Sequence, residues 1–478
     1  MKINNLLSCI VIWPLIPVVA FTNINDYTMM FFRQPGKFLL IFIFLLSVKP
    51  RLNAQDSTML QLPAQWTLQQ CFDYALKNNI QLNSLRLSKM SSDQDLLLSR
   101  AAKLPNLTGS VSQDLNGGKS VTAAGNSSYR VNTTGNYGVN SSVTLFQGGY
   151  LNNDIKQKNL LTQVAGLNIA QQVNDITVLI TQAYLNILLA KENIVYVQDV
   201  VATSEAQVKQ GQQQYDVGSI ALIGLVQLKA QLSNDRYLLV TAENQHRQNK
   251  LVLKQLLQLP SSYNFEIQEP DTLITNTRLY ALQEVQDSAL ANRPEVKSSE
   301  LGIQVSNLDL AKARAGYLPT LTAGGALGSS YVSGGANSAY FKQMDNNFYQ
   351  QIGLTLSVPI FTRRVVKTNV EKAKIEVDQS KLVLQDTKTN LTQTIEQSYI
   401  DVLNAQSQYD AAVEQLKYSQ EGYRIASEQL KVGAANIVVF LQQKNLYIQA
   451  LQSYIQAKYN AALNIRIYDF YRGIPVKL

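Results

Sequence analysis

Histidine and cysteine are almost absent from this chain of 478 residues. His246 is the single histidine, and Cys9 and Cys71 are the only cysteines. The chain therefore has too few of these residues for metal sites built from imidazole and thiolate ligands or for acid/base catalysis by histidine. We interpret His246, within ENQHRQNK, as a residue on the polar face of a helix. The sequence predicts no metal site and no cofactor.

Motifs of the common enzyme classes are also missing. The chain contains no GxxxxGK[ST], no GxSxG, no HExxH and no Cys/His cluster. Glu300, Asp309, Glu371 and Glu376 lie at helical spacings among lysines, which is typical of a solvated face rather than a catalytic pair. An enzyme would need a pocket with convergent polar groups, and no such pattern is found. We predict no catalytic residue and no enzymatic activity.

Charge is sparse, and its distribution argues against a polyanionic partner. Only 16% of the residues are charged, and the formal net charge is +8. The segment 1–54 carries half of that excess. No run of consecutive Lys and Arg interleaved with aromatic residues occurs, so the sequence predicts no nucleic-acid partner.

The segment 1–54 has the composition of a leader that ends in a signal peptide. An apolar run at 38–48 follows Arg33 and Lys37, and it is too short to span a bilayer but suits the core of a secretion signal. Cleavage is expected after Ala54. An anchor helix at 6–21, which two prolines interrupt, is the alternative, and Met29 or Met30 is an alternative start. An exported mature chain would keep only Cys71 and would have no internal disulfide.

After the leader, the chain consists of two repeats of about 215 residues. ALKNNIQ at Ala75 matches ALANRPE at Ala289. Further along the chain the offset between matching positions is larger by one, which places a single insertion in the second hairpin. The pairs with the larger offset are Phe146 and Phe361, Tyr184 and Tyr399, and Gly218 and Gly433.

Each repeat contains a long predicted helix with apolar residues at every seventh position. Such a period indicates helices packed side by side with a left-handed supercoil. Each run ends at a glycine, Gly218 or Gly433, where a left-handed C-cap costs least, and the chain then turns back. Taken alone, this pattern fits two ordinary αα-hairpins. The residues in register are Ile187, Ile194, Val201, Val208 and Tyr215, and then Val402, Tyr409, Leu416, Tyr423 and Leu430.

Before each long helix the pattern alternates with a period of two, which predicts a β-hairpin with one apolar and one polar face. The first hairpin pairs 107–115 with 137–145, and the polar stretch at 116–136 is expected to be a long solvated loop. The second hairpin has its alternation at 348–360. A soluble hairpin on a core is the alternative for either one. Two copies at the same place in a repeat, behind an export signal, favour a membrane.

Four strands cannot close a barrel, and free strand edges are not tolerated in lipid. Three chains would supply twelve strands, and about ten residues per strand with alternating faces is typical of an outer-membrane barrel with a wet lumen. Aromatic residues at both ends of the strands fit two interfacial girdles. They are Tyr331, Tyr340, Phe341, Phe348 and Tyr349 toward the loops, and Phe146, Tyr150, Tyr317 and Phe361 toward the helices.

The predicted fold is mainly α with a β-barrel contribution. Each repeat combines a β-hairpin with long coiled-coil helices. The expected segments are a leader and signal peptide at 1–54, N-terminal helices of the first repeat at 55–106, β-hairpin 1 at 107–146, helical hairpin 1 at 147–260 with its tip near 218, a connector at 261–280, helices of the second repeat at 281–319, β-hairpin 2 at 320–361, helical hairpin 2 at 362–465 with its tip near 433, and a C-terminal segment at 466–478.

These segments, in this order, resemble the TolC-like outer membrane efflux protein family over essentially everything after residue 64. The resemblance lies in ALKNN and ALANRP, in LPNLTGS and LPTLTAG entering the hairpins, in VTLFQGG and SVPIF leaving them, and in YDVGSI and LKVGAAN at the helical turns. It implies a homotrimer with a 12-stranded barrel in outer-membrane lipid and an α-helical barrel across the periplasm. It also implies a periplasmic adaptor protein and an inner-membrane pump as partners.

The resemblance further implies that the two helical turns form the periplasmic entrance and contact the adaptor. The contact candidates are Tyr215, Val217, Gly218, Ser219, Leu225, Leu430, Val432, Gly433, Ala434 and Phe440. Some members of the family hold the entrance shut with charged residues beyond the tip glycine. Here SIALIGLVQL and AANIVVFLQQ are uncharged, so we predict an apolar gate instead. Its candidates are Leu222, Ile223, Val438 and Val439.

The sequence thus favours the outer-membrane channel of a tripartite efflux or type I secretion system, a passive export duct. A periplasmic coiled-coil adaptor or scaffold is the alternative. It would explain the heptads but not the amphipathic hairpins. Nothing in the sequence identifies the exported substrate or which pump and adaptor serve the duct.

Overall fold

A computed structural model describes residues 63–121, 125, 127–270, 279–333 and 339–476. They belong to one structural unit, Pro63–Leu478. The predicted leader and signal peptide at 1–54 lie outside the described residues.

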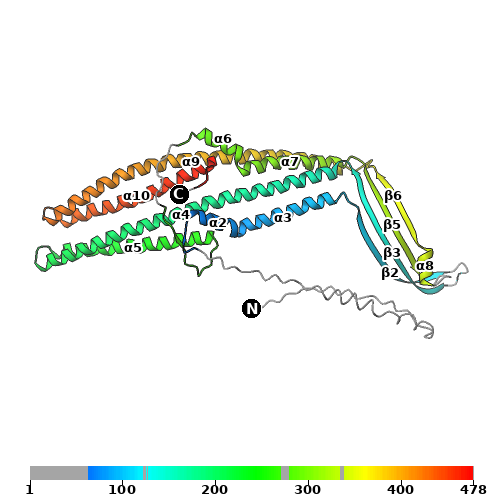
Figure 1. Ribbon diagram of the computed structural model, residues 1–478, viewed down its shortest axis with the longest axis horizontal. Coiled ribbons are helices and arrows are strands. Elements are labelled where there is room, and N and C mark those ends of the chain that lie inside the picture. Colours follow the sequence, from blue (N-terminus) through cyan, green and yellow to red (C-terminus); the bar gives the residue numbers. More distant parts are fainter. Residues whose placement is uncertain (1–62, 122–124, 126, 271–278, 334–338, 477–478) are drawn as a thin grey trace, which may run out of the picture. The chain divides into compact units, whose positions relative to one another are not determined.

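The two sequence repeats fold into two copies of one arrangement (Figure 1). In each, two helices lead into a pair of strands, and a helix of 67 residues is followed by a helix of 35 or 36. The first copy comprises α2 (Leu68–Asn78), α3 (Ile80–Ala101), β2 (Asn106–Val121), β3 (Ser127–Gln147), α4 (Tyr150–Asp216) and α5 (Leu222–Leu256). The second comprises α6 (Leu282–Asn292), α7 (Pro294–Ala315), β5 (Thr320–Val332), β6 (Tyr349–Ser357), α9 (Val365–Lys431) and α10 (Ile437–Arg472).

Local signals in the sequence set several of these boundaries. Thr67 and Gln70 form a capping box at the start of α2, where each side chain accepts a hydrogen bond from the other residue's backbone N–H. Asn79 ends α2 and caps α3, because its side chain accepts from the N–H of Leu82 at 3.0 Å. In the second repeat Pro294 begins α7, a position at which the missing N–H costs nothing.

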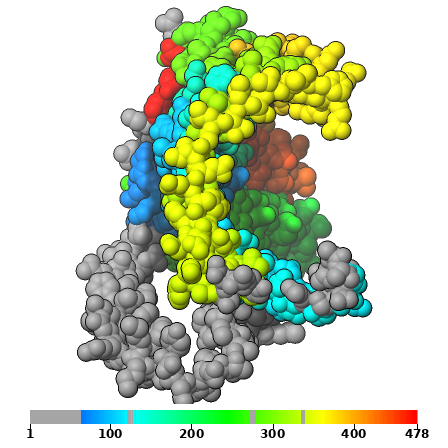
Figure 2. All heavy atoms as spheres, turned by 90° about the vertical axis from the view of Figure 1, so that its right-hand side faces the viewer, coloured from blue at the N-terminus to red at the C-terminus, as the bar shows by residue number. Residues whose placement is uncertain are grey.

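The four long strands form one antiparallel sheet in the order β2-β3-β5-β6. Their register confirms the alternation seen in the sequence, since apolar side chains from all four strands fall on one face and mostly Ser, Thr, Asn and Gly fall on the other. Seen from the sheet end, the sheet is curved and lies around a hollow (Figure 2). The apolar face carries Leu107, Val111, Val139, Leu327, Ile352, Leu354 and Leu356.

The predicted loop at 116–136 is wrong over most of its length. β2 continues to Val121 and β3 begins at Ser127, so that Asn116 pairs with Asn132 and Val121 with Ser127. Cross-strand hydrogen bonds satisfy the backbone N–H and C=O groups of this polar stretch, so it forms strands although it has no apolar face. The ring of Tyr129 also covers Gly117, where a Cβ would lie 2.5 Å from the tyrosine hydroxyl.

Two further elements were not foreseen. A short helix, α8 (Tyr340–Asn346), lies between β5 and β6 and places the ring of Tyr340 5.0 Å from that of Tyr331 and 6.3 Å from that of Tyr137. Two of the aromatic residues expected toward the loops, Tyr331 and Tyr340, are therefore in contact. In the connector, β4 (Glu266–Ile267) pairs in parallel with β1 (Gln65–Trp66). The remainder of the connector, at 271–278, lies outside the described residues.

The long helices α4 and α9 each span about 100 Å at 1.5 Å per residue. Near the sheet the contacts run α3 to α4, α4 to α7, and α7 to α9. Toward the other end they run α5 to α4, α4 to α10, and α10 to α9. Among the described residues, α4 is also the one helix long and apolar enough to pass a simple test for a membrane span, but half of the stretch is buried against its neighbours.

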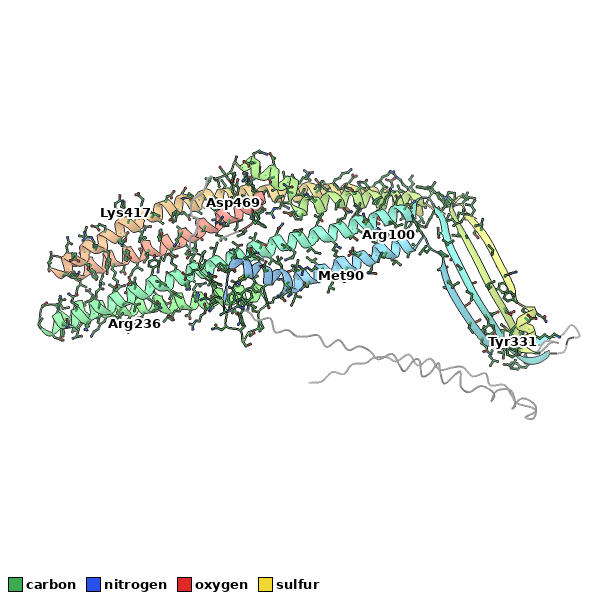
Figure 3. The ribbon with its side chains drawn as sticks, in the orientation of Figure 1. Met90, Arg100, Arg236, Tyr331, Lys417 and Asp469 are labelled. Carbon is green, nitrogen blue, oxygen red and sulfur yellow. The ribbon has the colours of Figure 1, made fainter. Side chains whose placement is uncertain are left out.

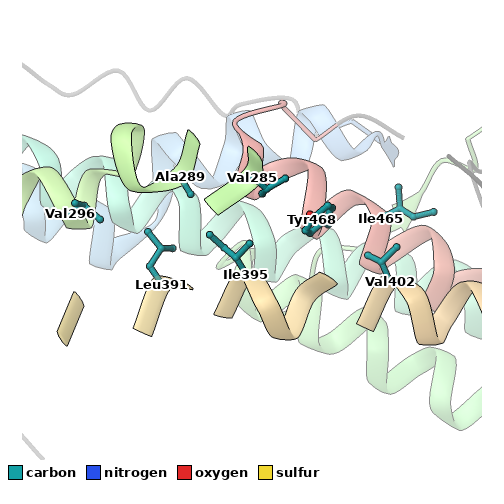
Figure 4. Packing of buried hydrophobic residues seen from close by; sticks show 8 residues of the cluster. All are labelled: Val285, Ala289, Val296, Leu391, Ile395, Val402, Ile465 and Tyr468. Carbon is teal, nitrogen blue, oxygen red and sulfur yellow. The ribbon is translucent and has the colours of Figure 1, made fainter. Parts of the chain in front are cut away.

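The core lies midway along the helices, where the short α6 packs between α9 and α10 (Figure 4). Burial of these side chains fixes the point at which the chain changes from the sheet-proximal helices to the distal ones. The cluster consists of Val285, Ala289, Val296, Leu391, Ile395, Val402, Ile465 and Tyr468. In the first repeat, Tyr184 donates its hydroxyl proton at this level to the carbonyl of Gln268 at 2.5 Å.

Candidate functional site

Each helical hairpin ends in a tight turn built on a left-handed glycine. Gly218 has φ = 75° and Gly433 has φ = 72°, values that a side chain would make costly. In the first turn the N–H of Ser219 donates to the carbonyl of Gln214 at 2.8 Å, and in the second that of Ala434 donates to Gln429 at 2.8 Å. Both turns therefore satisfy the last carbonyls of their long helices in the same way.

The structure places most of the predicted contact candidates on the surface of the two tips. Val217 is 79% exposed and Val432 77% exposed, next to the turn glycines. Tyr215, Ser219 and Ala434 are exposed as well, and Leu430 is half-buried.

Leu225 and Phe440 are different, because their side chains are only 3% and 1% exposed. Phe440 lies against Tyr423 of α9, with ring centroids 5.7 Å apart. These two residues pack the inside of the tip and do not form its surface. The sequence did not distinguish them, because a heptad stripe identifies apolar positions but not the neighbour that covers each of them.

The four apolar gate candidates lie at the starts of α5 and α10. Leu222, Ile223, Val438 and Val439 are between 42% and 65% exposed in the single chain. Val438 also borders a groove between α5 and α10 of about 660 Å³. Behind them the two tips approach closely at Gly224, where a Cβ would lie 2.8 Å from Cδ1 of Ile437.

A buried ion pair lies close to the tips and joins the two repeats. Nζ of Lys444 on α10 lies 2.9 Å from Oδ2 of Asp235 on α5, and the two side chains are 2% and 0% exposed. Ser204 on α4 completes the cluster, since its hydroxyl donates to Asp235 and accepts from Lys444. Burial lowers the pKa of Lys444, and the hydrogen bond and charge of Asp235 oppose that shift.

This cluster was missed at the level of sequence. Lys444 corresponds to Lys229 in the first repeat, and Lys229 is exposed. Asp235 corresponds to Ala450, which is fully buried. A charged residue at a position that the other repeat fills with a buried alanine is the signal that could have revealed the pair. Its partner lies in the other repeat and could not have been assigned from spacing.

Among the described residues no group of three or more His, Cys, Asp or Glu side chains could hold a metal ion. His246 is half-buried on α5, and burial together with the charge of Lys250 lowers its pKa. Cys71 is fully buried, which raises the pKa of its thiol to about 12.

Long antiparallel helices in two repeats, each with a membrane-type β-hairpin at one end and a glycine turn at the other, define the class of outer-membrane channel proteins with a helical extension. The sequence profile of the outer membrane efflux protein family matches residues 72–258 and 285–465. The chain belongs to this family, and it is an outer-membrane protein that extends into the periplasm.

Characterised relatives and solved structures agree with this assignment. The chain is 24% identical to outer membrane protein TolC of Escherichia coli over 346 residues, covering 68% of this chain and 69% of the relative. It is 20% identical to outer membrane efflux protein BepC of Brucella suis, covering 81% of each. Its fold is similar to that of CusC, with a TM-score of 0.73, 18% identity and coverage of 86% of this chain and 95% of the other. It is also similar to that of VceC from Vibrio cholerae, with a TM-score of 0.72, 14% identity and coverage of 85% and 96%.

Proposed function

We propose that three copies of this chain form a passive export duct, with a 12-stranded barrel in the outer membrane and a helical barrel in the periplasm. The observation that carries the proposal is the sheet with two free edges. Both edge strands expose apolar side chains at alternate positions, with Leu107 and Val111 on β2 75% and 76% exposed and Ile352 on β6 94% exposed. Unpaired edges with one apolar face are not stable in lipid, whereas a closed ring of strands is.

The helices support the same closure. Within the chain α4 packs against α7, which belongs to the other repeat, and the equivalent contact for α9 is α3 of a second copy. The faces of α3 and α9 that would form this contact are apolar and are not covered by the described residues of the same chain. On α3 they expose Ile80, Leu87, Met90, Leu97 and Leu98, and on α9 Ile375, Leu382, Val383, Ile400 and Leu403.

The duct has no chemistry of its own in this proposal, so energy and selection come from an inner-membrane pump. A periplasmic adaptor protein would bind the exposed tip residues, chiefly Val217, Ser219, Val432 and Ala434. TolC, a toxin and drug export protein and a pyoverdine export protein are among the relatives, which supports a role in export without defining the substrate. The adaptor or scaffold alternative leaves the membrane-type sheet without a role.

Fractionation tests this proposal. We expect the protein to stay in the outer-membrane pellet after a high-salt wash and to run as a heat-sensitive trimer in detergent, because its sheet is held in lipid by apolar contacts. Release of the chain by salt alone, as a soluble species, would contradict the duct and favour the adaptor.

The apolar gate gives a second prediction. Serine at Val438 or Val439 should raise single-channel conductance in planar bilayers by about twofold or more, because an apolar constriction closes a pore by excluding water. Val252→Ser, near the end of α5 and far from the tips, is the control and should leave the conductance unchanged. Wild-type conductance in both gate variants would show that these residues do not line the constriction.

A further inference from the structure

The turn that leads from the sheet into each of the two longest helices, α4 and α9, has the same unusual backbone in both repeats. In the first repeat Gly148 and Gly149 have φ = 58° and 81°. The equivalent positions of the second repeat are occupied by Arg363 and Arg364, with φ = 47° and 67°. Glycine adopts this left-handed region without strain, whereas a residue with a Cβ does not. The second repeat therefore places two arginines where the backbone favours glycine, which indicates that their side chains have a use.

Both arginines are exposed, and among the described residues neither guanidinium forms a hydrogen bond or an ion pair. They do not act alone. Arg100 and Arg314 occupy equivalent positions in the last turns of α3 and α7, also exposed and without a partner for their side chains among the described residues. Figure 3 shows Arg100 at the sheet end of α3. Four free guanidinium groups, counted over the described part of the chain, thus lie at the ends of three helices next to the sheet.

On the sheet side of these arginines the chain exposes large apolar side chains. Ile360 is 95% exposed and Phe361 83% exposed, three and two residues before Arg363. Leu104 and Tyr317 follow Arg100 and Arg314 by a few residues and are 67% and 51% exposed. An aromatic and aliphatic border followed by a basic one is the pattern of a membrane interface, with the cations at the depth of the lipid phosphates.

We propose that Arg363 and Arg364, with Arg100 and Arg314, form a basic border along the sheet whose guanidinium groups bind the phosphate groups of anionic phospholipid at the periplasmic surface of the outer membrane. A guanidinium binds a phosphate through two parallel hydrogen bonds, which ammonium groups cannot do. Acidic side chains on the neighbouring helix turns already have partners, because Asp95 is paired with Lys158, Asp154 and Asp309 with Lys312, and Glu371 with Lys374. This inference rests on the barrel placement proposed above.

The test uses the full-length trimer in phosphatidylcholine vesicles that contain spin-labelled phosphatidylglycerol or spin-labelled phosphatidylcholine. Electron paramagnetic resonance measures the association of each labelled lipid with the protein. We expect wild type to prefer phosphatidylglycerol, and R363G/R364G, which restores the glycines of the first repeat, to lower that preference about fivefold. R236A/R424A is the matched control. It removes two arginines on the distal halves of α5 and α9 and should keep the wild-type preference.

An equal preference in wild type and R363G/R364G, or an equal loss in R236A/R424A, would overturn the lipid site while leaving the duct intact. If R363G/R364G does not assemble, the single variant R364G decides, because glycine adopts the left-handed backbone at this position (φ = 67°) without strain and the exposed side chain it removes has no partner among the described residues. An unchanged preference in R364G would then overturn the site. A wild-type protein that does not insert into vesicles at all would contradict both the proposed duct and this inference.

Discussion

Replacing Lys444 by methionine is expected to lower the free energy of local opening at the tip ends of α5 and α10 by about 3–5 kcal/mol. The substitution leaves the carboxylate of Asp235, which is 0% exposed, with Ser204 and Gln231 as hydrogen-bond partners but no counter-charge. A buried charge without its partner retains its desolvation cost. Hydrogen–deuterium exchange followed by mass spectrometry should show protection of the tip amides falling by about two to four orders of magnitude.

Two variants separate the loss of the ion pair from a general effect of substitution. D235L/K444M removes both charges and should recover most of the protection, since an apolar pair of similar volume is often neutral. Lys431→Met breaks an exposed pair with Glu428, in which the side chains are 56% and 57% exposed, and should change protection less than about threefold. A double variant as unprotected as K444M would show that packing, not charge, is responsible.

Leu354→Arg should prevent most of the chain from reaching the outer membrane as a trimer. Leu354 lies on the apolar face of β6 and is 70% exposed in the single chain. On the lipid face of a barrel an arginine near the bilayer centre costs about 2–4 kcal/mol. Three copies in one trimer multiply that penalty. The measurement is the yield of heat-sensitive trimer in the outer-membrane pellet.

The adjacent residue provides the control. Thr355 lies on the polar face of the same strand, which faces the wet interior of the proposed barrel. Thr355→Arg should therefore keep a trimer yield close to that of wild type. Equal losses for the two variants would mean that the faces of the sheet are not divided between lipid and water as proposed.

Periodicity explains why so much of the fold could be predicted from the sequence. The apolar period of seven and the match between the two repeats placed the long helices, and the structure has them at Tyr150–Asp216 and Val365–Lys431. Alternation placed the strands and their two faces, because a period of two survives only when one face is apolar. The turn glycines Gly218 and Gly433 were correct, since few other residues adopt their backbone.

Features without a period could not be predicted in this way. The extension of β2 to residue 121 and of β3 back to residue 127 depends on cross-strand pairing of polar residues, and their composition resembles that of a loop. The pairing of β1 with β4 brings together a segment before α2 and one after α5. The burial of Leu225 and Phe440 and the pairing of Lys444 with Asp235 depend on which helix covers a given face. Heptad spacing does not contain that information.

Closure of one barrel by three chains requires a specific register between neighbouring copies. Within the chain β3 pairs with β5 so that Ser142 lies opposite Gly324. Ser357 on β6 is the equivalent of Ser142 in the second repeat, and Ser110 on β2 is the equivalent of Gly324 in the first repeat. The same pairing between copies therefore places Ser357 opposite Ser110 of the next copy, with both side chains on the polar face.

The most direct measurement is therefore disulfide crosslinking of S110C/S357C in outer membranes, followed by denaturing electrophoresis without reductant. Cys71 is buried and should not interfere. A closed trimeric barrel predicts a covalent trimer that resists heating, whereas S110C/T355C, displaced by two residues along β6, should crosslink far less. A chain that stays monomeric under oxidation, although it is in the outer membrane, would contradict the closed trimeric barrel.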